Sequence, residues 1–327
     1  MAETIKAVAV TGDGSLQIEA RSRPVPGPGE VLLDIKAAGV NRGDLMQRKG
    51  LYPPPPGAPP TMGLEAVGVI AETGEGVTGW SPGDRVGALI AGGGYGEAVA
   101  VDQGSLLPLP DTLSFVDAAC FPEALMTVWA NVFLRCDLKP GEAFLCQGGT
   151  SGIGVMAIQM ARAWGAGPIF ATAGSDKKVA VMAELGATHP INYRTEDFAD
   201  VVKAAGGVDV VLDMVGGDYV QKHIDLINLD GRICNIAYQN GFTVELNLIR
   251  LMMKRGILTG TTLRARTKEE KSAIRAAVET HFWPKVADGT IKPLVDSTFA
   301  LEDADAAQAR MAEGGHVGKI VLTIGDV

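Results

Sequence analysis

Short apolar runs separated by clusters of glycine and proline make up the chain before residue 114. The runs alternate with turn segments such as Arg23–Gly29, Ser81–Asp84 and Ala91–Gly94. Many short strands with this punctuation predict a compact, barrel-like β domain. The expected strands are Ile5–Val10, Leu16–Glu19, Glu30–Ala38, Ala66–Glu72, Arg85–Leu89 and Ala98–Val101.

A helical pattern begins at Ser114–Ala119, which supplies a cap and an apolar face, and continues through Met126–Leu134. Beyond it, strands and helices alternate, which predicts an α/β fold with a doubly wound parallel sheet. The expected strands are Ala143–Cys146, Pro168–Thr172, Pro190–Asn192, Val208–Met214 and Gly231–Ile236, with Gly256–Leu263 last as an edge strand. The expected helices are Val155–Ala161, Val179–Leu185, Phe198–Ala205 and Tyr219–Leu226.

The turn after Ala143–Cys146 has the composition of a dinucleotide-binding loop. Gly149 and Gly154 match the first and third glycines of a G-x-G-x-x-G motif, and Ser151 stands at the second. Such a turn aims backbone N–H groups, here those of Gly152 and Ile153, and the positive end of a helix at a pyrophosphate. The Cβ of Ser151 keeps the backbone slightly farther from the phosphate, and its hydroxyl can donate a hydrogen bond instead.

The end of the next strand indicates which dinucleotide binds. A site for NAD usually carries Asp or Glu about 20 residues past the glycine turn, where it accepts from the ribose 2′-OH. Here Gly174 and Ser175 end the strand, and Lys177 and Lys178 follow Asp176. A serine hydroxyl and a lysine favour a dianionic 2′-phosphate. The sequence therefore predicts NADPH.

Composition and charge narrow the class of protein. The 327 residues are too many for one typical core, so we expect two domains. The formal net charge of −9 argues against binding to nucleic acid or to an anionic membrane. The four cysteines lack C-x-x-C spacing, no signal peptide opens the chain, and no apolar run reaches the ~18 residues of a membrane span. We therefore expect a cytoplasmic protein with buried thiols.

Over essentially its whole length, the sequence resembles the zinc-free quinone oxidoreductases of the medium-chain dehydrogenase/reductase superfamily, most closely the p53-inducible type and more distantly the zeta-crystallin-like enzymes. The resemblance is carried by Gly39–Leu45, Gly50–Gly57, Gly63–Gly68, Gln147–Gly154 and Thr172–Lys178. It implies a GroES-like β-barrel catalytic domain at residues 1–123, completed by 294–327, and a Rossmann NADPH-binding domain at 124–293. The strand Lys319–Thr323 would then return to the β domain, and two copies of the chain would form a homodimer.

The resemblance also implies that the chain holds no zinc. In the zinc alcohol dehydrogenases of this superfamily a cysteine stands at the position of Asn41, and a histidine at the position of Leu64. Neither Asn41 nor Leu64 supplies such a ligand. The closely spaced cysteines of the structural zinc lobe are missing as well.

Two residues are implied as catalytic. Asn41 would hydrogen-bond a substrate carbonyl or the nicotinamide ribose, although an asparagine in a turn often bonds its own backbone. Tyr52 precedes four prolines and would lie at the nicotinamide end, the alternative being a surface aromatic ring packed on prolines. The implied cofactor-binding residues are Asn41, Tyr52, Thr127, Gly149, Ser151, Gly152, Ile153, Gly174, Ser175, Lys178, Tyr193, Gly216 and Leu263. Lys178 and Tyr193 among them would clasp the 2′-phosphate.

Other polar residues are expected to be structural. Asp213, at the end of an apolar strand, is expected to cap the turn that follows it. The four histidines, His189, His223, His281 and His316, share no spacing and are expected to be non-catalytic.

The activity implied is hydride transfer from NADPH to a quinone or a related conjugated carbonyl, with protons from solvent or Tyr52. The cofactor supplies the chemistry, and the protein binds, orients and excludes water. One alternative is a reductase of 2-alkenals or enoyl thioesters. Another is an NADPH-binding protein with a structural or RNA-binding role. A zinc alcohol dehydrogenase is the weakest alternative, given Asn41 and Leu64.

Overall fold

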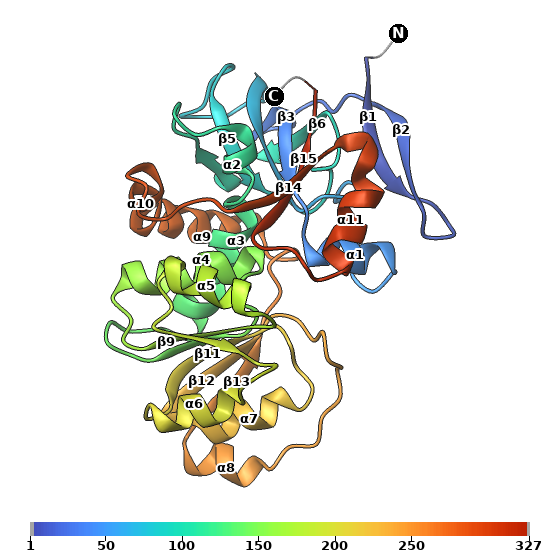
Figure 1. Cartoon of the computed structure of the whole chain (residues 1–327). Coiled ribbons are helices and arrows are strands. Elements are labelled where there is room, and N and C mark those ends of the chain that lie inside the picture. Colours follow the sequence, from blue (N-terminus) through green and yellow to red (C-terminus); the bar gives the residue numbers. More distant parts are fainter. Residues whose placement is uncertain (1–2, 326–327) are drawn as a thin grey trace. The chain divides into compact units, whose positions relative to one another are not determined.

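The structure is a computed structural model that describes residues 3–325 and separates into two compact units (Figure 1). Unit 1 consists of Met1–Met126, Arg264–His281 and Pro293–Val327, and unit 2 of Thr127–Leu263 and Phe282–Lys292. The expected domain boundaries, 1–123 with 294–327 and 124–293, stay a prediction. In the observed division, 264–281 packs with unit 1.

Unit 1 contains, within the described residues, a seven-stranded sheet in the order β14-β15-β3-β4-β5-β7, with β6 also paired to β3. A separate antiparallel pair joins β1 (Thr4–Val10) to β2 (Leu16–Ser22). The sheet strands are β3 (Glu30–Gly39), β4 (Glu65–Thr73), β5 (Arg85–Leu89), β6 (Ala98–Asp102), β7 (Leu106–Pro108), β14 (Val295–Ala300) and β15 (Lys319–Thr323). Because β15 pairs antiparallel with β3, the prediction that the C-terminal strand returns to the N-terminal sheet is confirmed.

Strand β3 is buried on both faces, which explains its nearly unbroken apolar sequence. Successive side chains on a strand point to opposite faces. Val31, Leu33 and Ile35 point into the larger core, while Leu32 packs on the other side with Ile5 of β1. The helices of unit 1 are α1 (Arg42–Arg48), α2 (Phe115–Ala118), the start of α3 (Pro122–Val128), α9 (Lys268–His281) and α11 (Ala304–Ala312). Of these, α1, α9 and α11 were not among the expected helices.

Unit 2 is a doubly wound parallel sheet in the order β10-β9-β8-β11-β12-β13, as predicted. Its strands are β8 (Phe144–Cys146), β9 (Ile169–Ala173), β10 (His189–Asn192), β11 (Val208–Asp213), β12 (Ile227–Asn235) and β13 (Ile257–Gly260). The strand order reverses between β8 and β11. At such a switch point, ligands bind outside the carboxyl ends of the strands.

Helices cover both faces of this sheet. Helices α4 (Gly152–Trp164) and α5 (Asp176–Leu185) lie on one face, and α6 (Phe198–Ala204), α7 (Tyr219–Leu226) and α8 (Leu248–Met253) lie on the other (Figure 1). The short helix α10 (Trp283–Ala287) also belongs to unit 2. Strand β13 is an edge strand, which confirms the prediction for this segment in a shorter form.

The helix expected at Met126–Leu134 is divided. Helix α3 ends at Val128, and a π-helix follows over Trp129–Arg135. The side chain of Asn131 donates to the carbonyl of Thr127 at 2.8 Å, and the backbone N–H of Cys136 bonds the carbonyl of Asn131. A side chain that bonds a backbone carbonyl within the helix competes with its regular hydrogen-bond ladder, which accounts for the change of helix type.

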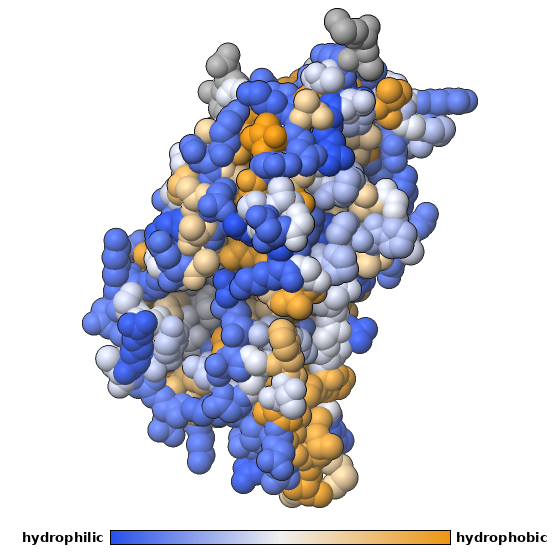
Figure 2. Space-filling view, turned by 90° about the vertical axis from the view of Figure 1, so that its right-hand side faces the viewer, coloured by the Kyte–Doolittle hydropathy of each residue, from blue (hydrophilic) through white to orange (hydrophobic). Residues whose placement is uncertain are grey.

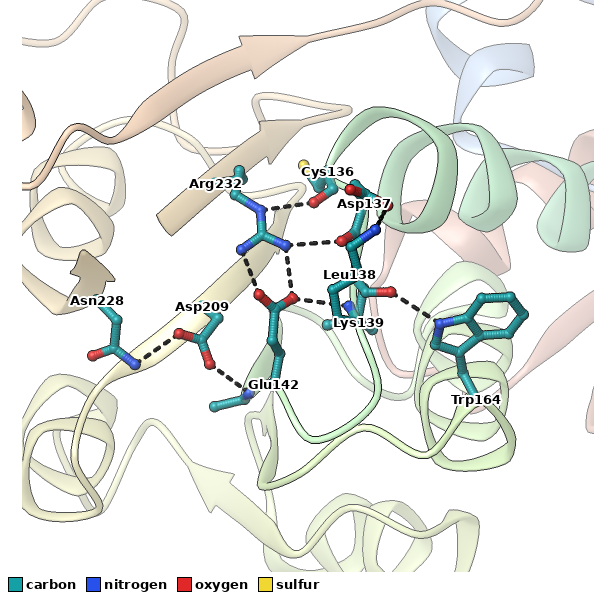
Figure 3. Close-up of polar contacts among 10 residues, drawn as sticks. Cys136, Asp137, Leu138, Lys139, Glu142, Trp164, Asp209, Asn228 and Arg232 are labelled. Atoms are coloured by element: carbon teal, nitrogen blue, oxygen red, sulfur yellow. Dashed lines mark hydrogen bonds and ion pairs between the residues drawn. The ribbon is translucent and has the colours of Figure 1, made fainter. Parts of the chain in front are cut away.

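The loop that leads into β8 is held by Arg232 of β12 (Figure 3). Its guanidinium pairs with Glu142 through both terminal nitrogens at 2.9 and 2.7 Å, and it donates to the carbonyls of Cys136 and Asp137. Trp164 of α4 donates to the Leu138 carbonyl at 2.9 Å. A planar guanidinium with this many fixed partners holds the loop in one conformation and thereby sets where β8 begins.

Unit 2 also exposes an apolar patch around α8, defined by Leu229, Phe242, Leu248, Ile249, Met252, Met253 and Ile257. None of the residues of α8 is buried. Figure 2 shows hydrophobic side chains gathered at the lower end of the view. Among the described residues, no helix has the length and apolar character needed to cross a bilayer.

Candidate functional site

The β8–α4 turn has the geometry of a phosphate cradle. A Cβ on Gly154 would lie 2.3 Å from the Gly148 carbonyl oxygen, and one on Gly149 would lie 2.5 Å from Met182 Sδ. Both positions therefore require glycine, as the motif predicts. The N–H groups at Gly152 and Ile153, in the first turn of α4, have no partner in the preceding helical turn and carry the positive end of the helix dipole.

Ser151 has a different role in this turn from the one expected of its hydroxyl. It is the N-cap of α4, and its Oγ accepts from the Gly154 N–H at 3.0 Å. The hydroxyl itself donates towards Met214 Sδ at 3.5 Å. Ser151 thus fixes the start of the helix. Its contribution to phosphate binding remains a prediction, for which its backbone position is better suited than its hydroxyl.

At the end of β9, the nearest carboxylate is already engaged. Asp176 accepts from the Asn192 side chain through Oδ1 at 2.7 Å. Ser175 caps α5 by accepting from the Lys178 N–H at 3.4 Å. Lys177 is exposed and Lys178 half-buried. The assignment of Lys178 to the 2′-phosphate stays a prediction.

Two side chains from the segment after β10 lie over Gly174. A Cβ there would lie 2.6 Å from the Tyr193 hydroxyl and 3.3 Å from Arg194 Nε. Tyr193 was expected at this position, and Arg194 was missed. Its guanidinium, next to the Tyr193 phenol, makes this corner of unit 2 suited to a phosphate group. The sequence could have indicated Arg194, because it directly follows Tyr193, which was expected at the 2′-phosphate.

Three further predicted cofactor residues, Thr127, Gly216 and Leu263, belong to the same unit. Gly216 follows β11 in a turn with a positive φ of 68°, and Leu263 follows β13. These residues, like Gly149 and Gly174, come after the carboxyl ends of parallel strands, where the fold places ligands. Thr127, which was expected at a helix start, is instead near the end of α3 and only 7% exposed.

A buried polar chain lies beneath the glycine turn. Thr172 donates to Gln147 Oε1 at 2.6 Å, and Gln147 Nε2 lies 2.9 Å from His223 Nε2. His223 Nδ1 is 3.5 Å from Asp213 Oδ2, and both side chains are completely buried. Asn235 completes the chain by donating to Asp213 at 2.6 Å. His223 therefore stabilises the glycine turn through its contact with Gln147. The spacing of the histidines in the sequence could not have predicted this contact.

Asp213 also caps its turn, as expected. It accepts from the backbone N–H groups of Val215 and Gly216. Burial opposes its ionisation, but the nearby His223 imidazole and the hydrogen bonds from these two N–H groups hold the pKa of Asp213 below its ordinary value. The turn that carries Gly216 is thus fixed by a carboxylate.

In unit 1, Asn41 precedes α1 within a buried polar cluster. Its carboxamide oxygen accepts from Lys319 Nζ at 2.7 Å, and its nitrogen donates to Glu65 Oε1 at 2.9 Å and to the Gly39 carbonyl at 3.2 Å. Its backbone N–H donates to Asp44 at 2.8 Å. Both amide N–H groups are therefore used inside the unit. A substrate carbonyl would have to displace one of them, whereas Oδ1, which faces the Lys319 ammonium and the Asp44 N–H, is an acceptor suited to a hydroxyl donor.

Lys319 is the cation of this cluster and was not among the predicted site residues. Its ammonium lies 2.5 Å from Glu65 Oε1 and 4.0 Å from Glu123 Oε2, and its side chain is only 4% exposed. Burial alone would lower the pKa of Lys319, but the carboxylates of Glu65 and Glu123 raise it above its ordinary value. The sequence signal was an ionisable residue that opens the otherwise apolar run Lys319–Thr323.

Asp44 lies in the same cluster and is completely buried. Its Oδ2 accepts from the Tyr95 hydroxyl at 2.9 Å as well as from the Asn41 N–H. Burial raises the pKa of Asp44 to about 7, an effect that these two hydrogen bonds and the charge of Lys319 only partly oppose. The cluster thus contains a carboxyl group that titrates near neutral pH.

Tyr52 is held by Arg264. The Arg264 guanidinium lies 5.2 Å from the centre of the Tyr52 ring and donates to the Tyr52 carbonyl at 2.8 Å. It also donates to the Ala91 carbonyl and to Gln47 Oε1, both at 2.7 Å. Burial raises the pKa of the Tyr52 phenol, although the nearby cation partly opposes this. The phenol therefore keeps its proton at neutral pH and is able to donate it.

The residues at the position of the zinc ligands do not fit zinc. Asn41 and Leu64 offer a carboxamide and an alkyl group in place of a thiolate and an imidazole. The ammonium of Lys319 contacts Asn41 and Glu65, where a second cation would be repelled. Within residues 3–325 no three His, Cys, Asp or Glu side chains form a group that could hold a metal ion.

Two family models match this chain. The family described as "Alcohol dehydrogenase GroES-like domain" matches residues 27–111, and the family described as "Zinc-binding dehydrogenase" matches residues 185–322. Among curated proteins, the synaptic vesicle membrane protein VAT-1 homolog of Rattus norvegicus is 31% identical. That alignment covers 99% of this chain and 85% of the relative.

Two solved structures show the same architecture. The quinone oxidoreductase from Thermus thermophilus, determined also in complex with NADPH, is 30% identical with a TM-score of 0.83, covering 97% of this chain and 99% of that one. The CurK enoyl reductase is 25% identical with a TM-score of 0.86, covering 99% of this chain and 100% of that one. The likeness thus extends over both units.

Proposed function

We propose that this chain, which belongs to the medium-chain dehydrogenase/reductase superfamily, reduces quinones or related conjugated carbonyls with NADPH and without zinc. The observation that supports NADPH as the cofactor is the arrangement at the strand ends of unit 2, where the glycine turn follows β8 and the Tyr193 and Arg194 side chains lie over Gly174 after β9. The likeness to a quinone oxidoreductase, which was also solved in complex with NADPH, supports quinones as the substrate class.

The residues of unit 2 fit a dinucleotide. The backbone N–H groups around Gly149, Ser151, Gly152 and Ile153 would hold the pyrophosphate. Gly174, Ser175, Lys178 and Tyr193, with Arg194 added, would hold the 2′-phosphate through hydroxyl and cationic donors. Thr127, Gly216 and Leu263 would contact the remainder of the cofactor. When bound, NADPH supplies the hydride.

The residues of unit 1 are assigned to the substrate side. Tyr52 keeps its phenolic proton and would deliver it to the reduced oxygen, a general-acid role. Arg264 orients Tyr52 by bonding its carbonyl and lying against its ring. Asn41 would accept a hydroxyl group, because its N–H donors are already bonded to Glu65 and Gly39.

A screen of acceptors tests this proposal. Purified protein is expected to oxidise NADPH with 1,2-naphthoquinone at a rate that EDTA does not change, and elemental analysis should find well under one zinc per chain. Stoichiometric zinc, or turnover abolished by EDTA, would contradict the zinc-free reaction. No oxidation of NADPH by any quinone would contradict the substrate class.

The likeness to the CurK enoyl reductase favours one second candidate, a reductase of 2-alkenals or enoyl thioesters. The same cofactor cradle would serve it, since only the acceptor differs. Crotonyl-type substrates included in the same screen separate the two. A kcat/KM for crotonyl-CoA above that for every quinone would favour the enoyl reductase.

Cofactor preference is expected to depend on Lys178. NADPH should bind at least tenfold more tightly than NADH, which corresponds to about 1.4 kcal/mol, within the range of charge-assisted hydrogen bonds. Lys178→Ala should remove most of this preference and leave the NADH affinity nearly unchanged. Lys177→Ala is the matched control, because this neighbouring lysine is exposed. Equal dissociation constants for both cofactors in the wild type, measured by fluorescence titration, would contradict the assignment.

We further propose a homodimer that covers the α8 patch and the free edge of β13. An apolar edge strand left uncovered promotes aggregation, and a twofold dimer satisfies both edges at once. Light scattering should report twice the 34.1 kDa of one chain. Met252→Glu with Met253→Glu should shift it towards monomer, because both side chains are exposed on α8. Val25→Glu is the control, because Val25 is an exposed apolar residue outside the patch, and this variant should remain a dimer. A wild-type protein that is a monomer at micromolar concentration would exclude the dimer.

A further inference from the structure

The buried residues Asn41, Glu65 and Lys319 of unit 1 form, with the partly exposed Glu123, a cluster that combines charges with a predicted site residue. We propose that Lys319 is a positioning residue, a built-in cation that locks the Asn41 carboxamide so that it can only accept a hydrogen bond from its ligand. The proposal rests on the proposed function, in which Asn41 contacts the cofactor or the substrate. It assigns to an ammonium group the positive charge that a metal ion would carry next to Asn41.

The charge of Glu65 makes a cation necessary at this place. Its Oε1 accepts from Lys319 and from the Asn41 nitrogen, and its Oε2 accepts from the Glu123 N–H at 2.9 Å. The side chain is completely buried. A buried carboxylate is stable only when it is paired and hydrogen-bonded. Lys319, which is 278 residues away from Asn41 in the sequence, provides that pair.

The same two charges determine the orientation of Asn41. Its oxygen faces the ammonium, and its nitrogen faces the Glu65 carboxylate and the Gly39 carbonyl. Rotating the amide by half a turn would place NH₂ against a cation and oxygen against an anion, so both contacts would become repulsive. Charge therefore fixes an orientation that an asparagine among neutral neighbours would leave open.

The locked amide selects the chemistry of its ligand. With both N–H groups used, the hydrogen-bonding atom of Asn41 left to a ligand is Oδ1, which accepts from Lys319 and faces the Asp44 N–H in the capping box of α1. A hydroxyl group, such as that of a ribose or of a hydroquinone, fits this acceptor. A carbonyl oxygen does not, because two oxygens without a proton between them repel each other.

A mutant cycle on kcat/KM tests the coupling of Lys319 to Asn41. Lys319→Met alone would leave Glu65 buried without its cation, so the cycle uses the neutral double variant Lys319→Met/Glu65→Gln, which keeps the side-chain volumes. Asn41→Ala and the double variant should each lower kcat/KM about tenfold or more. The triple variant should fall within about twofold of Asn41→Ala, because Lys319 then has no amide to position.

A purely structural ion pair predicts a different result. In that case the fold-decreases in kcat/KM caused by Asn41→Ala and by the double variant would multiply in the triple variant. This result would overturn the proposal. Unchanged kcat/KM in either the double variant or Asn41→Ala would overturn it too. Arg310→Met/Asp296→Asn is the matched control, since it neutralises another ion pair of unit 1, with atoms 2.9 Å apart. Its factor should multiply with that of Asn41→Ala.

The outcome also separates this proposal from the proposed function. A wild-type protein that reduces neither quinones nor enals contradicts the function alone, and the same four proteins are then compared by their NADPH dissociation constants. The positioning role is supported if the double variant changes the NADPH dissociation constant of the wild type but not that of Asn41→Ala. It is overturned if the two changes in the dissociation constant multiply in the triple variant, or if the double variant leaves the dissociation constant unchanged. An active wild type with multiplying factors contradicts the positioning role alone.

Discussion

Replacing Gly154 with alanine should weaken NADPH binding by more than about a hundredfold and destabilise unit 2. The added Cβ would lie 2.3 Å from the Gly148 carbonyl oxygen and 2.7 Å from backbone atoms of Gly149. Backbone atoms cannot rotate away as a flexible side chain does, so the turn itself must open. Overpacking of this kind costs roughly 1–3 kcal/mol in stability, and the opened turn no longer presents its N–H groups to a pyrophosphate.

The measurement is a NADPH titration of the variant, with circular dichroism to record its folding. Gly12→Ala serves as the control, because a Cβ at that position would meet nothing within 4 Å. It should bind NADPH as the wild type does. Wild-type affinity in a folded Gly154→Ala protein would show that the glycine turn does not bind the cofactor.

Replacing Asp44 with asparagine should make the protein less sensitive to rising pH. Asp44 has a pKa of about 7 in the folded protein, above its ordinary value of 3.8. Between these two values the folded protein binds a proton that the unfolded chain has released. The stability that Asp44 contributes is therefore complete below about pH 4 and is lost as the pH rises towards 7.

Asparagine keeps an oxygen to accept from the Asn41 N–H and the Tyr95 hydroxyl, and it carries no charge. Between pH 5.5 and 8.5, the unfolding free energy of Asp44→Asn relative to the wild type should rise by about 2 kcal/mol, at 1.36 kcal/mol per pKa unit. Urea unfolding at the two pH values measures it. Asp111→Asn is the control, because its side chain is fully exposed. A constant difference across the two pH values would show that Asp44 does not titrate near neutral pH.

The glycine turn and the β9 end could be predicted because their chemistry is local. Gly154 and Ser175 act within a few residues of their partners, and the alternation of apolar runs identified β8, β9 and the helix between them. The prediction of a doubly wound sheet was confirmed for the same reason, since each strand–helix unit is contiguous. Helix α9 was not predicted, because its sequence is mostly polar. The π-helix was not predicted, because it depends on a single hydrogen bond of the Asn131 side chain.

The sequence alone determined the family resemblance and the position of the glycine turn. The tertiary structure alone decided what Asn41 can do, that Arg264 holds Tyr52 and that His223 supports the glycine turn. Asn41 and Lys319 are 278 residues apart, and Tyr52 and Arg264 are 212 apart. Contacts of this kind leave no periodicity or spacing in the chain, because the tertiary fold, and not sequence proximity, brings their partners together. Burial strengthens the electrostatic part of such contacts, because a charge removed from water interacts strongly with its neighbours.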